Sequence, residues 1–124
     1  MKILFLDDNE NRQIHFYSEW SKNKKSEDLL FQTRTAKETI EVLKNESPFD
    51  VLSLDHDLGG KVFVKEVEET GYQVALFIEN ELAEKLLPSA VVIHSHNPAG
   101  SNRMRQALSK RNIKIYNIPY SVVQ

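Results

Sequence analysis

Residues 51–57 read VLSLDHD, and this stretch decides the fold class. Its first four residues have the length and mainly apolar composition of a buried strand, and three polar residues follow at once. The same arrangement recurs in residues 3–8 (ILFLDD) and in residues 90–97 (AVVIHSHN). Three short strands that are each followed by a cluster of polar residues predict one sheet with a polar edge.

Stretches of helical period alternate with these apolar runs, which is typical of βα units around a mostly parallel sheet. Five strands are expected, at Ile3–Leu6, Leu29–Thr33, Val51–Leu54, Ala90–Ile93 and Ile113–Tyr116. Regular apolar stripes predict three helices, around Ala36, Ile40 and Leu43, around Ala75, Ile78 and Leu82, and around Met104, Ala107 and Leu108. The sequence therefore predicts a single α/β domain over residues 1–124.

The starts of two helices are well signalled. Thr35–Glu38 has the form of a capping box, and Asn97 provides an N-cap before a proline at the first helical position. A helix over about residues 11–22 is less regular, because its apolar residues spread around more than one face.

The composition restricts the classes of function. The 124 residues include 16 Lys and Arg against 18 Asp and Glu, a net charge of -2, so no extended surface for nucleic acid or anionic membrane is expected. The absence of cysteine excludes disulfides, thiolate zinc sites and cysteine nucleophiles. The first apolar run ends in two acids, which fits neither a signal peptide nor a membrane span. We expect a soluble cytoplasmic protein, and its oligomeric state is left open.

The three polar clusters are expected to meet at one edge of the sheet. In open α/β sheets, ligands bind outside the carboxyl ends of the strands. Two carboxylates about 4 Å apart repel by roughly 1 kcal/mol in water and about 4 kcal/mol at an effective dielectric near 20, so something must offset the repulsion. A divalent cation is the natural candidate. Carboxylates favour Mg or Mn, our first expectation, and neighbouring imidazoles extend the choice to Mn, Fe or Zn.

The acids also have simpler interpretations. One of Asp7 and Asp8 can cap the following helix while the other is solvated. Asp55 and Asp57 can form a turn before the next two glycines. We favour a functional site for the second pair, because a turn does not require His56 between the two acids.

Two further histidines follow the fourth strand. His94 and His96 share a face if the strand continues that far, and they diverge if it ends at His94. Either is a candidate metal ligand or general acid/base, because imidazole exchanges protons near neutral pH. His15 is a lone histidine in a helical stretch, and we assign it no role.

Phosphate binding has two candidate contributors. The run Asn97–Asn102, which includes the hydroxyl of Ser101, begins a helix with free amides, although a plain N-cap explains its first residue equally well. Arg12 can make a bidentate phosphate contact, and a surface ion pair with Glu19 or Asp8 is its alternative.

On these residues the chain resembles the receiver domains of two-component response regulators. Asp7 and Asp8 match the acid pair after strand one, Asp55 matches the phosphoacceptor, and Ser95 matches the Ser/Thr position after strand four. The chain departs from receivers at Ile118, where they have a lysine before the proline after strand five. The resemblance implies a receiver/flavodoxin-like three-layer sandwich with a five-stranded parallel sheet in the order 2-1-3-4-5, with the closing helix missing.

The chain is more closely similar to a divergent group, the cyclic-phosphate processing receiver domains. The stretches LFLDDNENR, TAKE, SLDHDLGG, TGYQVA and IHSHNPAGSNRM carry this resemblance, and LDHDL together with HSHNP is its specific part. It implies processing of cyclic nucleotides or of cyclic phosphate ends of nucleic acids. It also implies a metal held by Asp7, Asp8, Asp55 and Asp57, and a phosphate lined by His56, His94, Ser95, His96 and Asn97.

The expected function is therefore metal-dependent hydrolysis of a cyclic phosphate, carried by a phosphorylated small molecule or a nucleic-acid end, with a histidine protonating the leaving alkoxide. Two alternatives stay open. One is a signalling receiver phosphorylated on Asp55, and the other is a module that binds a cyclic nucleotide without cleaving it. Residues 58–70 form either a lid or an extension of the third helix, and the sequence assigns them no role.

Overall fold

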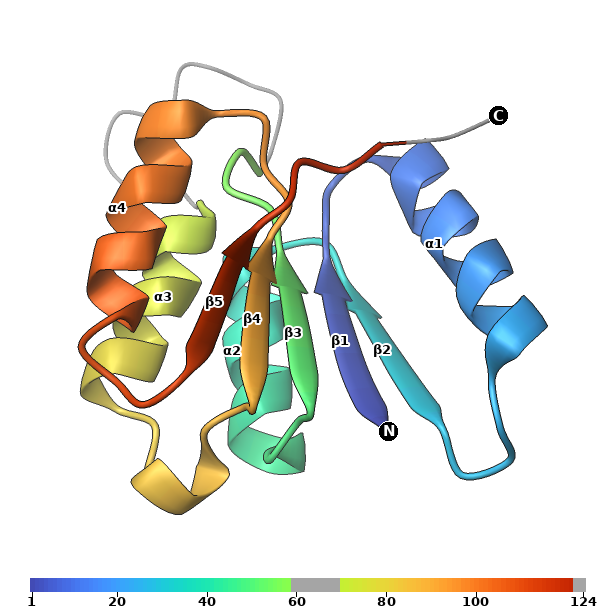
Figure 1. Ribbon diagram of the computed structural model, residues 1–124, viewed down its shortest axis with the longest axis horizontal. Coiled ribbons are helices and arrows are strands. Elements are labelled where there is room, and N and C mark those ends of the chain that lie inside the picture. The colour runs from blue at the N-terminus through green and yellow to red at the C-terminus, as the bar shows by residue number, and fades with distance from the viewer. Residues whose placement is uncertain (59–69, 122–124) are drawn as a thin grey trace.

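The computed structural model describes residues 1–58 and 70–121, and it contains one parallel sheet with the strand order β2-β1-β3-β4-β5 (Figure 1). The strands are β1 (Lys2–Leu6), β2 (Leu29–Thr33), β3 (Val51–Leu54), β4 (Ala90–Ile93) and β5 (Lys114–Asn117). The helices are α1 (Glu10–Asn23), α2 (Ala36–Glu46), α3 (Gly71–Asn80) and α4 (Pro98–Leu108), with a 3-10 turn at Glu84–Leu86. The predicted fold class and strand order are confirmed.

The helices are divided unequally between the two faces of the sheet. Helices α2, α3 and α4 form a layer on one face, and α1 lies on the other (Figure 1). All strands point the same way, so the loops that follow β1, β3 and β4 meet at one edge. In the described residues after β5, the chain up to Ser121 forms no further helix and crosses this edge toward α1.

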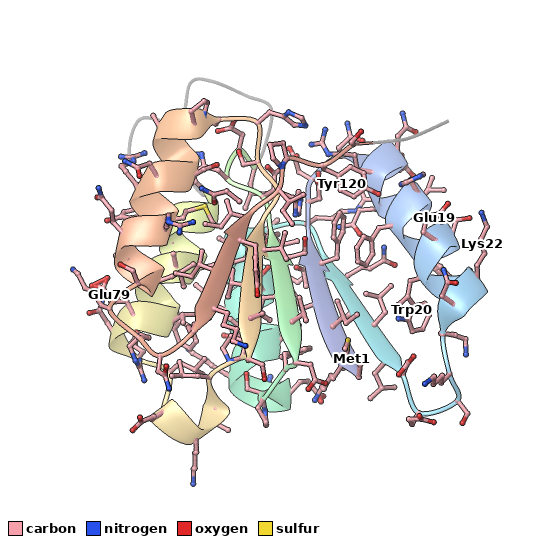
Figure 2. All side chains as sticks on the ribbon, viewed as in Figure 1. Met1, Glu19, Trp20, Lys22, Glu79 and Tyr120 are labelled. Atoms are coloured by element: carbon pink, nitrogen blue, oxygen red, sulfur yellow. The ribbon has the colours of Figure 1, made fainter. Side chains whose placement is uncertain are left out.

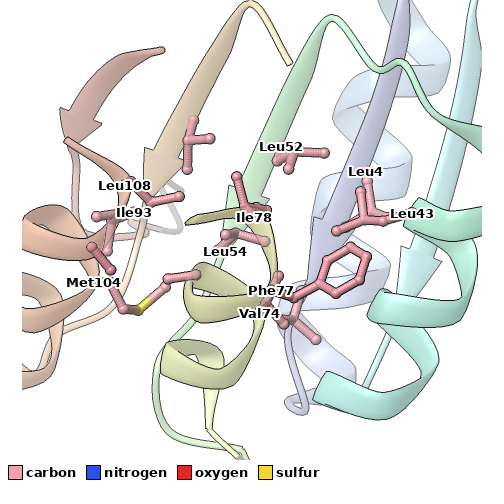
Figure 3. Packing of buried hydrophobic residues seen from close by; sticks show 14 of the residues in the cluster. Leu4, Leu43, Leu52, Leu54, Val74, Phe77, Ile78, Ile93, Met104 and Leu108 are labelled. Atoms are coloured by element: carbon pink, nitrogen blue, oxygen red, sulfur yellow. The ribbon is translucent and has the colours of Figure 1, made fainter. Parts of the chain in front are cut away.

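Figure 3 shows the main core, which lies between the sheet and the layer of three helices. Alternate strand residues point into it, as the two-residue period of a strand requires. They meet apolar residues of the three helices, and the fully buried members include Leu4, Leu6, Leu43, Leu52, Leu54, Val74, Ile78, Val91, Met104 and Leu108. Burying each of these side chains stabilises the fold by roughly 1.5–3 kcal/mol before entropy is counted.

The opposite face carries an aromatic stack. Phe5 of β1 is fully buried, and its ring lies 4.1 Å from that of Phe16 in α1 and 4.7 Å from the His94 ring. Tyr120 packs against the same stack, and Figure 2 shows it at the upper edge of the sheet beside α1. His94, at the carboxyl edge, therefore packs against Phe5 on the face of the sheet opposite to the main core.

Helix α1 differs from its expectation in bounds and in packing. It runs from Glu10 to Asn23 rather than over residues 11–22, because the Asn9 side chain accepts a hydrogen bond from the amide of Arg12 and starts it earlier. The irregular pattern of its apolar residues agrees with its packing, because the apolar side chain of Ile14 is 61% exposed. The buried residue Gln13 instead donates to two backbone carbonyls at the ends of β1 and β2.

The N-caps expected for α2 and α4 are confirmed, but the Glu38 carboxylate accepts from the amide of Arg34 at 2.8 Å rather than from that of Thr35, so the expected capping box forms only in part. Thr35 accepts from the amide of Glu38 at 3.0 Å, and Asn97 accepts from the amide of Gly100 at 3.0 Å. Strand β5 is displaced by one residue from the expected position and covers Lys114–Asn117. None of the helices in residues 1–58 and 70–121 has the length and hydrophobicity that a membrane span requires.

Gly71 sets how closely α3 approaches the end of β3. A Cβ on this residue would lie 1.8 Å from the backbone carbonyl oxygen of Asp55. The substitution Gly71→Ala should therefore lower the free energy of unfolding by roughly 1–3 kcal/mol or more. Urea unfolding measures this, with Gln106→Ala on the exposed side of α4 as a control expected to change stability by less than about 0.5 kcal/mol. Equal stability of Gly71→Ala and the wild type would contradict the close approach.

Candidate functional site

Three residues from three adjacent strands meet at the carboxyl edge of the sheet. Asp7, Asp55 and His94 each come one residue after a strand, and the strands are in register there. The backbone ladder continues through them: the amide of Asp55 donates to Leu6, and the amide of His94 donates to Leu54, at 3.1 and 3.0 Å. The topology of the sheet therefore fixes the backbone of all three residues side by side.

The side chains of these residues are removed from water. Asp7 is 0% exposed, Asp55 5% and His94 2%. His94 Nε2 lies 3.0 Å from Asp7 Oδ2, and His94 Nδ1 lies 2.7 Å from the hydroxyl of Ser53. Since a carboxylate only accepts hydrogen bonds, Nε2 carries the proton and Nδ1 accepts from Ser53.

Arg12 places a positive charge beside both acids. Its Nε donates to Asp7 Oδ2 at 2.7 Å, and its Nη2 donates to Asp7 Oδ1 at 3.0 Å and to Asp55 Oδ2 at 3.5 Å. The sequence left open whether this residue pairs with Asp8 or Glu19 or binds phosphate. In the structure its bidentate partner is Asp7.

Burial and charge push the two carboxyl groups in opposite directions. Burial would raise the pKa of Asp7, but hydrogen bonds from His94 and Arg12 outweigh it and lower the pKa to about 2. Burial and the neighbouring charge of Asp7 raise the pKa of Asp55 to about 7. Burial also lowers the pKa of His94, so its ring is neutral at pH 7. Asp55 thus has the less stable negative charge of the pair.

One carboxylate oxygen of each acid and one ring nitrogen of His94 all lie within 4.8 Å of one another. Two carboxylates and an imidazole are a donor set that suits a divalent cation. The 3.0 Å between Nε2 and Asp7 Oδ2 is also about the separation of two neighbouring ligands with bonds near 2.1 Å. The residues present therefore fit a cation.

The expected metal set of four acids is divided in the structure. Asp8 is half-buried, and its charge contributes to the raised pKa of Asp55, but it is not a member of the group that could hold an ion in the described residues. The Asp57 side chain is 69% exposed and accepts from His56 Nδ1 at 2.8 Å and from Asn97 Nδ2 at 3.2 Å. Adjacent residues such as Asp7 and Asp8 point to opposite sides of an extended chain. Asp57 is separated from Asp55 because β3 ends at Leu54, so the two-residue period of the strand does not continue to Asp57.

His56 is a buried member of this second group. It is 4% exposed, its ring packs on Gly100, and a Cβ on that glycine would lie 2.5 Å from the ring. Among residues 1–58 and 70–121, its Nε2 has no hydrogen-bond partner, and this atom is buried. Asp57 therefore orients His56 between β3 and the start of α4.

The remaining predicted phosphate and catalytic residues lie in the loop after β4 and at the start of α4. Ser95 is buried, and its hydroxyl accepts from the amide of Asn97 at 3.0 Å, so it shapes the loop. Ser101 is 7% exposed, in the first turn of α4. His96 is exposed, and its Nε2 donates to the Tyr120 carbonyl at 2.8 Å.

Ser53 is the member of the site that the sequence pattern did not single out. It is a serine inside a strand of otherwise apolar residues, which is the one signal that the sequence offers. Ile118, where receivers have a lysine, is 57% exposed, and its amide donates to the carbonyl of Ile93 at the end of β4. The glycines expected to form a turn after Asp57 lie outside the described residues, as do residues 59–69 of the expected lid.

A family model described as the cyclic-phosphate processing receiver domain matches residues 2–110. The chain belongs to this family. No curated protein sequence matches the receiver domain described here.

Solved response regulators share the fold of this receiver domain. The Mn(2+)-bound form of response regulator Rcp1 is 17% identical, over 98% of this chain and 83% of that chain, with a TM-score of 0.63. The phosphorylated cyanobacterial phytochrome response regulator RcpA is 20% identical, over 98% and 81%, with a TM-score of 0.65. The N-terminal domain of a response regulator/sensory box/GGDEF 3-domain protein from Carboxydothermus hydrogenoformans is 19% identical, over 95% and 79%, with a TM-score of 0.61. At these identities the likeness establishes the fold alone.

The raised pKa of Asp55 predicts a gain of stability in Asp55→Asn without metal. The carboxyl group titrates near pH 7 in the folded chain and near pH 4 in the unfolded chain. Its contribution to stability is complete below about pH 4 and is lost as pH rises through about 7. Asparagine does not titrate, so the variant should be more stable than the wild type by roughly 1–3 kcal/mol at pH 8, and by less at pH 5. Urea unfolding in a chelator at both pH values measures the difference.

Asp57→Asn is the matched control. Burial would raise the pKa of Asp57, but hydrogen bonds from His56 and Asn97 lower it. The contribution of this group is present above its unfolded pKa and is lost as pH falls, so its removal should bring no gain at pH 8. Parallel pH profiles for Asp55→Asn and the wild type would mean that Asp55 is not the destabilised carboxylate.

Proposed function

We propose that this receiver domain is a metal-dependent phosphoesterase that opens cyclic phosphodiesters of nucleotides or nucleic-acid ends. The observation that carries the proposal is the group formed by Asp7, Asp55 and His94, whose ligand atoms lie within 4.8 Å of one another. The family description, which names cyclic-phosphate processing, supports the substrate class. The Mn(2+)-bound form of Rcp1 supports a divalent cation on this fold, and Mg or Mn is the proposed ion.

Asp7, Asp55 and His94 would hold the cation. When bound, it would supply positive charge to the nonbridging oxygens of the phosphate and lower the pKa of a water molecule. Arg12 lies at the same acids with its side chain 30% exposed, so its planar guanidinium is available to a phosphate at the mouth of the site. Asn97, at the start of α4, adds a helix N-terminus whose free amides favour an anion.

The proposed reaction adds one water to the cyclic ester. The water oxygen forms a bond to phosphorus, the bond from phosphorus to one sugar oxygen breaks, and a proton is transferred to that leaving oxygen. The product is a phosphomonoester with one free hydroxyl. A general acid near the leaving oxygen accelerates this step by roughly a hundred- to ten-thousand-fold.

Among the three histidines predicted to be catalytic, His96 suits the role of general acid best. Both ring nitrogens of His94 are engaged, with Asp7 and Ser53. His56 is buried and oriented by Asp57. His96 is exposed, lies near enough to influence the pKa of His94, and is bonded only through Nε2 to a backbone carbonyl among its described contacts.

A second candidate function is phosphoryl acceptance by Asp55, as in signalling receivers. The solved neighbours are response regulators, and they support this candidate more directly than they support hydrolysis. The position of Asp55 at the end of β3, beside Arg12 and Asp7, is compatible with it. The two candidates share the cation and differ in the fate of the phosphoryl group.

A panel of 2′,3′- and 3′,5′-cyclic nucleotides with Mg²⁺ or Mn²⁺, followed by phosphorus NMR, tests the proposal. The wild type should convert at least one member to a phosphomonoester, and Asp55→Asn should abolish turnover without unfolding. Incubation with a small phosphodonor and intact-mass measurement tests the second candidate. A lasting aspartyl phosphate with no hydrolysis would replace the proposal by the signalling function, and saturable binding with unchanged nucleotide would replace it by capture.

His96→Gln tests the assignment of the general acid. Its turnover should fall by roughly a hundredfold or more, because glutamine cannot donate a proton to the leaving alkoxide, while Mn²⁺ affinity stays at the wild-type value. Steady-state kinetics and a Mn²⁺ titration of the same preparation measure both quantities. Gln106→Ala, on the exposed side of α4, serves as the control and should retain wild-type turnover. Full turnover in His96→Gln would move the role to another group.

A further inference from the structure

Ser53 connects the second ring nitrogen of His94 to the sheet. It lies in β3 at 7% exposure, and its hydroxyl is 2.7 Å from His94 Nδ1. Phe5 lies against the imidazole, with the two rings inclined by 8° and their centroids 4.7 Å apart. Stacking on Phe5 and the hydrogen bond between Nδ1 and Ser53 therefore fix the orientation of the His94 ring, and its Nε2 points toward Asp7.

A hydroxyl can serve His94 in either of its neutral forms. While Nε2 donates to Asp7, the Ser53 hydroxyl donates its proton to Nδ1. If Nε2 binds a cation, the ring proton must be on Nδ1, and the same hydroxyl oxygen accepts it after a rotation about one bond. The number of protons on the ring is the same in both forms, so no buried charge is created. Alanine would leave Nδ1 without a partner in either form.

We propose that Ser53 is a positioning residue that presents His94 Nε2 as a metal ligand and thereby makes the site selective for Mn²⁺, Fe²⁺, Co²⁺ or Zn²⁺ over Mg²⁺. The reason is ligand chemistry, because Mg²⁺ favours oxygen ligands and imidazole favours transition metals. The inference rests on the proposed function only in placing a divalent cation at Asp7 and Asp55. It refines the choice between Mg and Mn and holds for either reaction.

The chain offers a matched pair of variants. Ser53→Ala removes the hydroxyl, and Ser53→Thr keeps it and adds a methyl group. A groove of about 380 Å³ is lined by Ser53, Val92, His94 and Tyr120 among others, so there is space for the methyl group on this face. Threonine is also favourable in a strand.

Calorimetric titrations of the three proteins with Mn²⁺ and with Mg²⁺ test the proposal without any substrate. The wild type should bind Mn²⁺ more tightly than Mg²⁺. Ser53→Ala should weaken Mn²⁺ binding roughly 10- to 100-fold and Mg²⁺ binding by less than about threefold, so that selectivity falls. Ser53→Thr should keep the affinity and selectivity of the wild type. Urea unfolding of each variant controls for loss of the fold.

Nitrogen-15 NMR of the wild-type histidine rings provides a second readout that needs no variant. Without metal, the His94 ring should carry its proton on Nε2, and with diamagnetic Zn²⁺ the proton should be on Nδ1. Unchanged Mn²⁺ affinity in Ser53→Ala, equal losses for both ions, or an Nε2 proton that persists with Zn²⁺ would overturn the proposal. Failure to hydrolyse cyclic phosphates would contradict only the proposed reaction, because these measurements contain no phosphate.

Discussion

The repulsion between two buried carboxylates, Asp7 and Asp55, is the constraint on which the rest of the site depends. Their backbones are neighbours because β1 and β3 are adjacent and in register, so the fold cannot separate them. Arg12 and His94 both bond to Asp7, which leaves Asp55 with the unfavourable charge and a pKa of about 7. A further positive charge at this site, such as a bound cation, would therefore stabilise the ionised form of Asp55.

The sheet has three helices on one face and one on the other, and the two faces contribute different side chains near Asp7 and Asp55. On the face with three helices, the strands contribute apolar side chains to the main core. On the face of α1, Phe5 of β1, Ser53 of β3 and His94, one residue after β4, form a stack and a hydrogen bond next to the two acids. The imidazole is thus supported from the sheet rather than from a loop, which favours precise placement.

Much of the fold follows from local patterns in the sequence. The bounds of β3 and β4 agree with the apolar runs, because a central parallel strand is short and nearly all apolar. The bounds of β2 also agree, although it is an edge strand whose Leu29 is exposed. The meeting of Asp7 and Asp55 also followed, from the rule that ligands lie at the carboxyl ends of strands. Where α1 begins and which residues it buries did not follow, because its contacts at Gln13 are hydrogen bonds to distant carbonyls and leave no apolar period.

The division of the site was beyond the sequence for a similar reason. Asp57 sits two residues from Asp55, and only the direction in which the chain leaves β3 decides that it bonds to His56 and Asn97 instead. Likewise, the adjacency of β3 and β4 turns Ser53, an isolated polar residue of a strand, into the partner of His94. Side-chain partners across strands depend on register, which a single sequence does not display.

The proposed function requires that Asp7 and Asp55 share one cation. The most direct measurement is a calorimetric titration with Mn²⁺ at pH 6, repeated in buffers with different heats of ionisation so that released protons are counted. With a pKa of about 7, the carboxyl group of Asp55 is mostly protonated at that pH and must lose its proton to become a ligand. One ion per chain should bind, with the release of close to one proton. No binding, or binding without proton release, would contradict a shared cation.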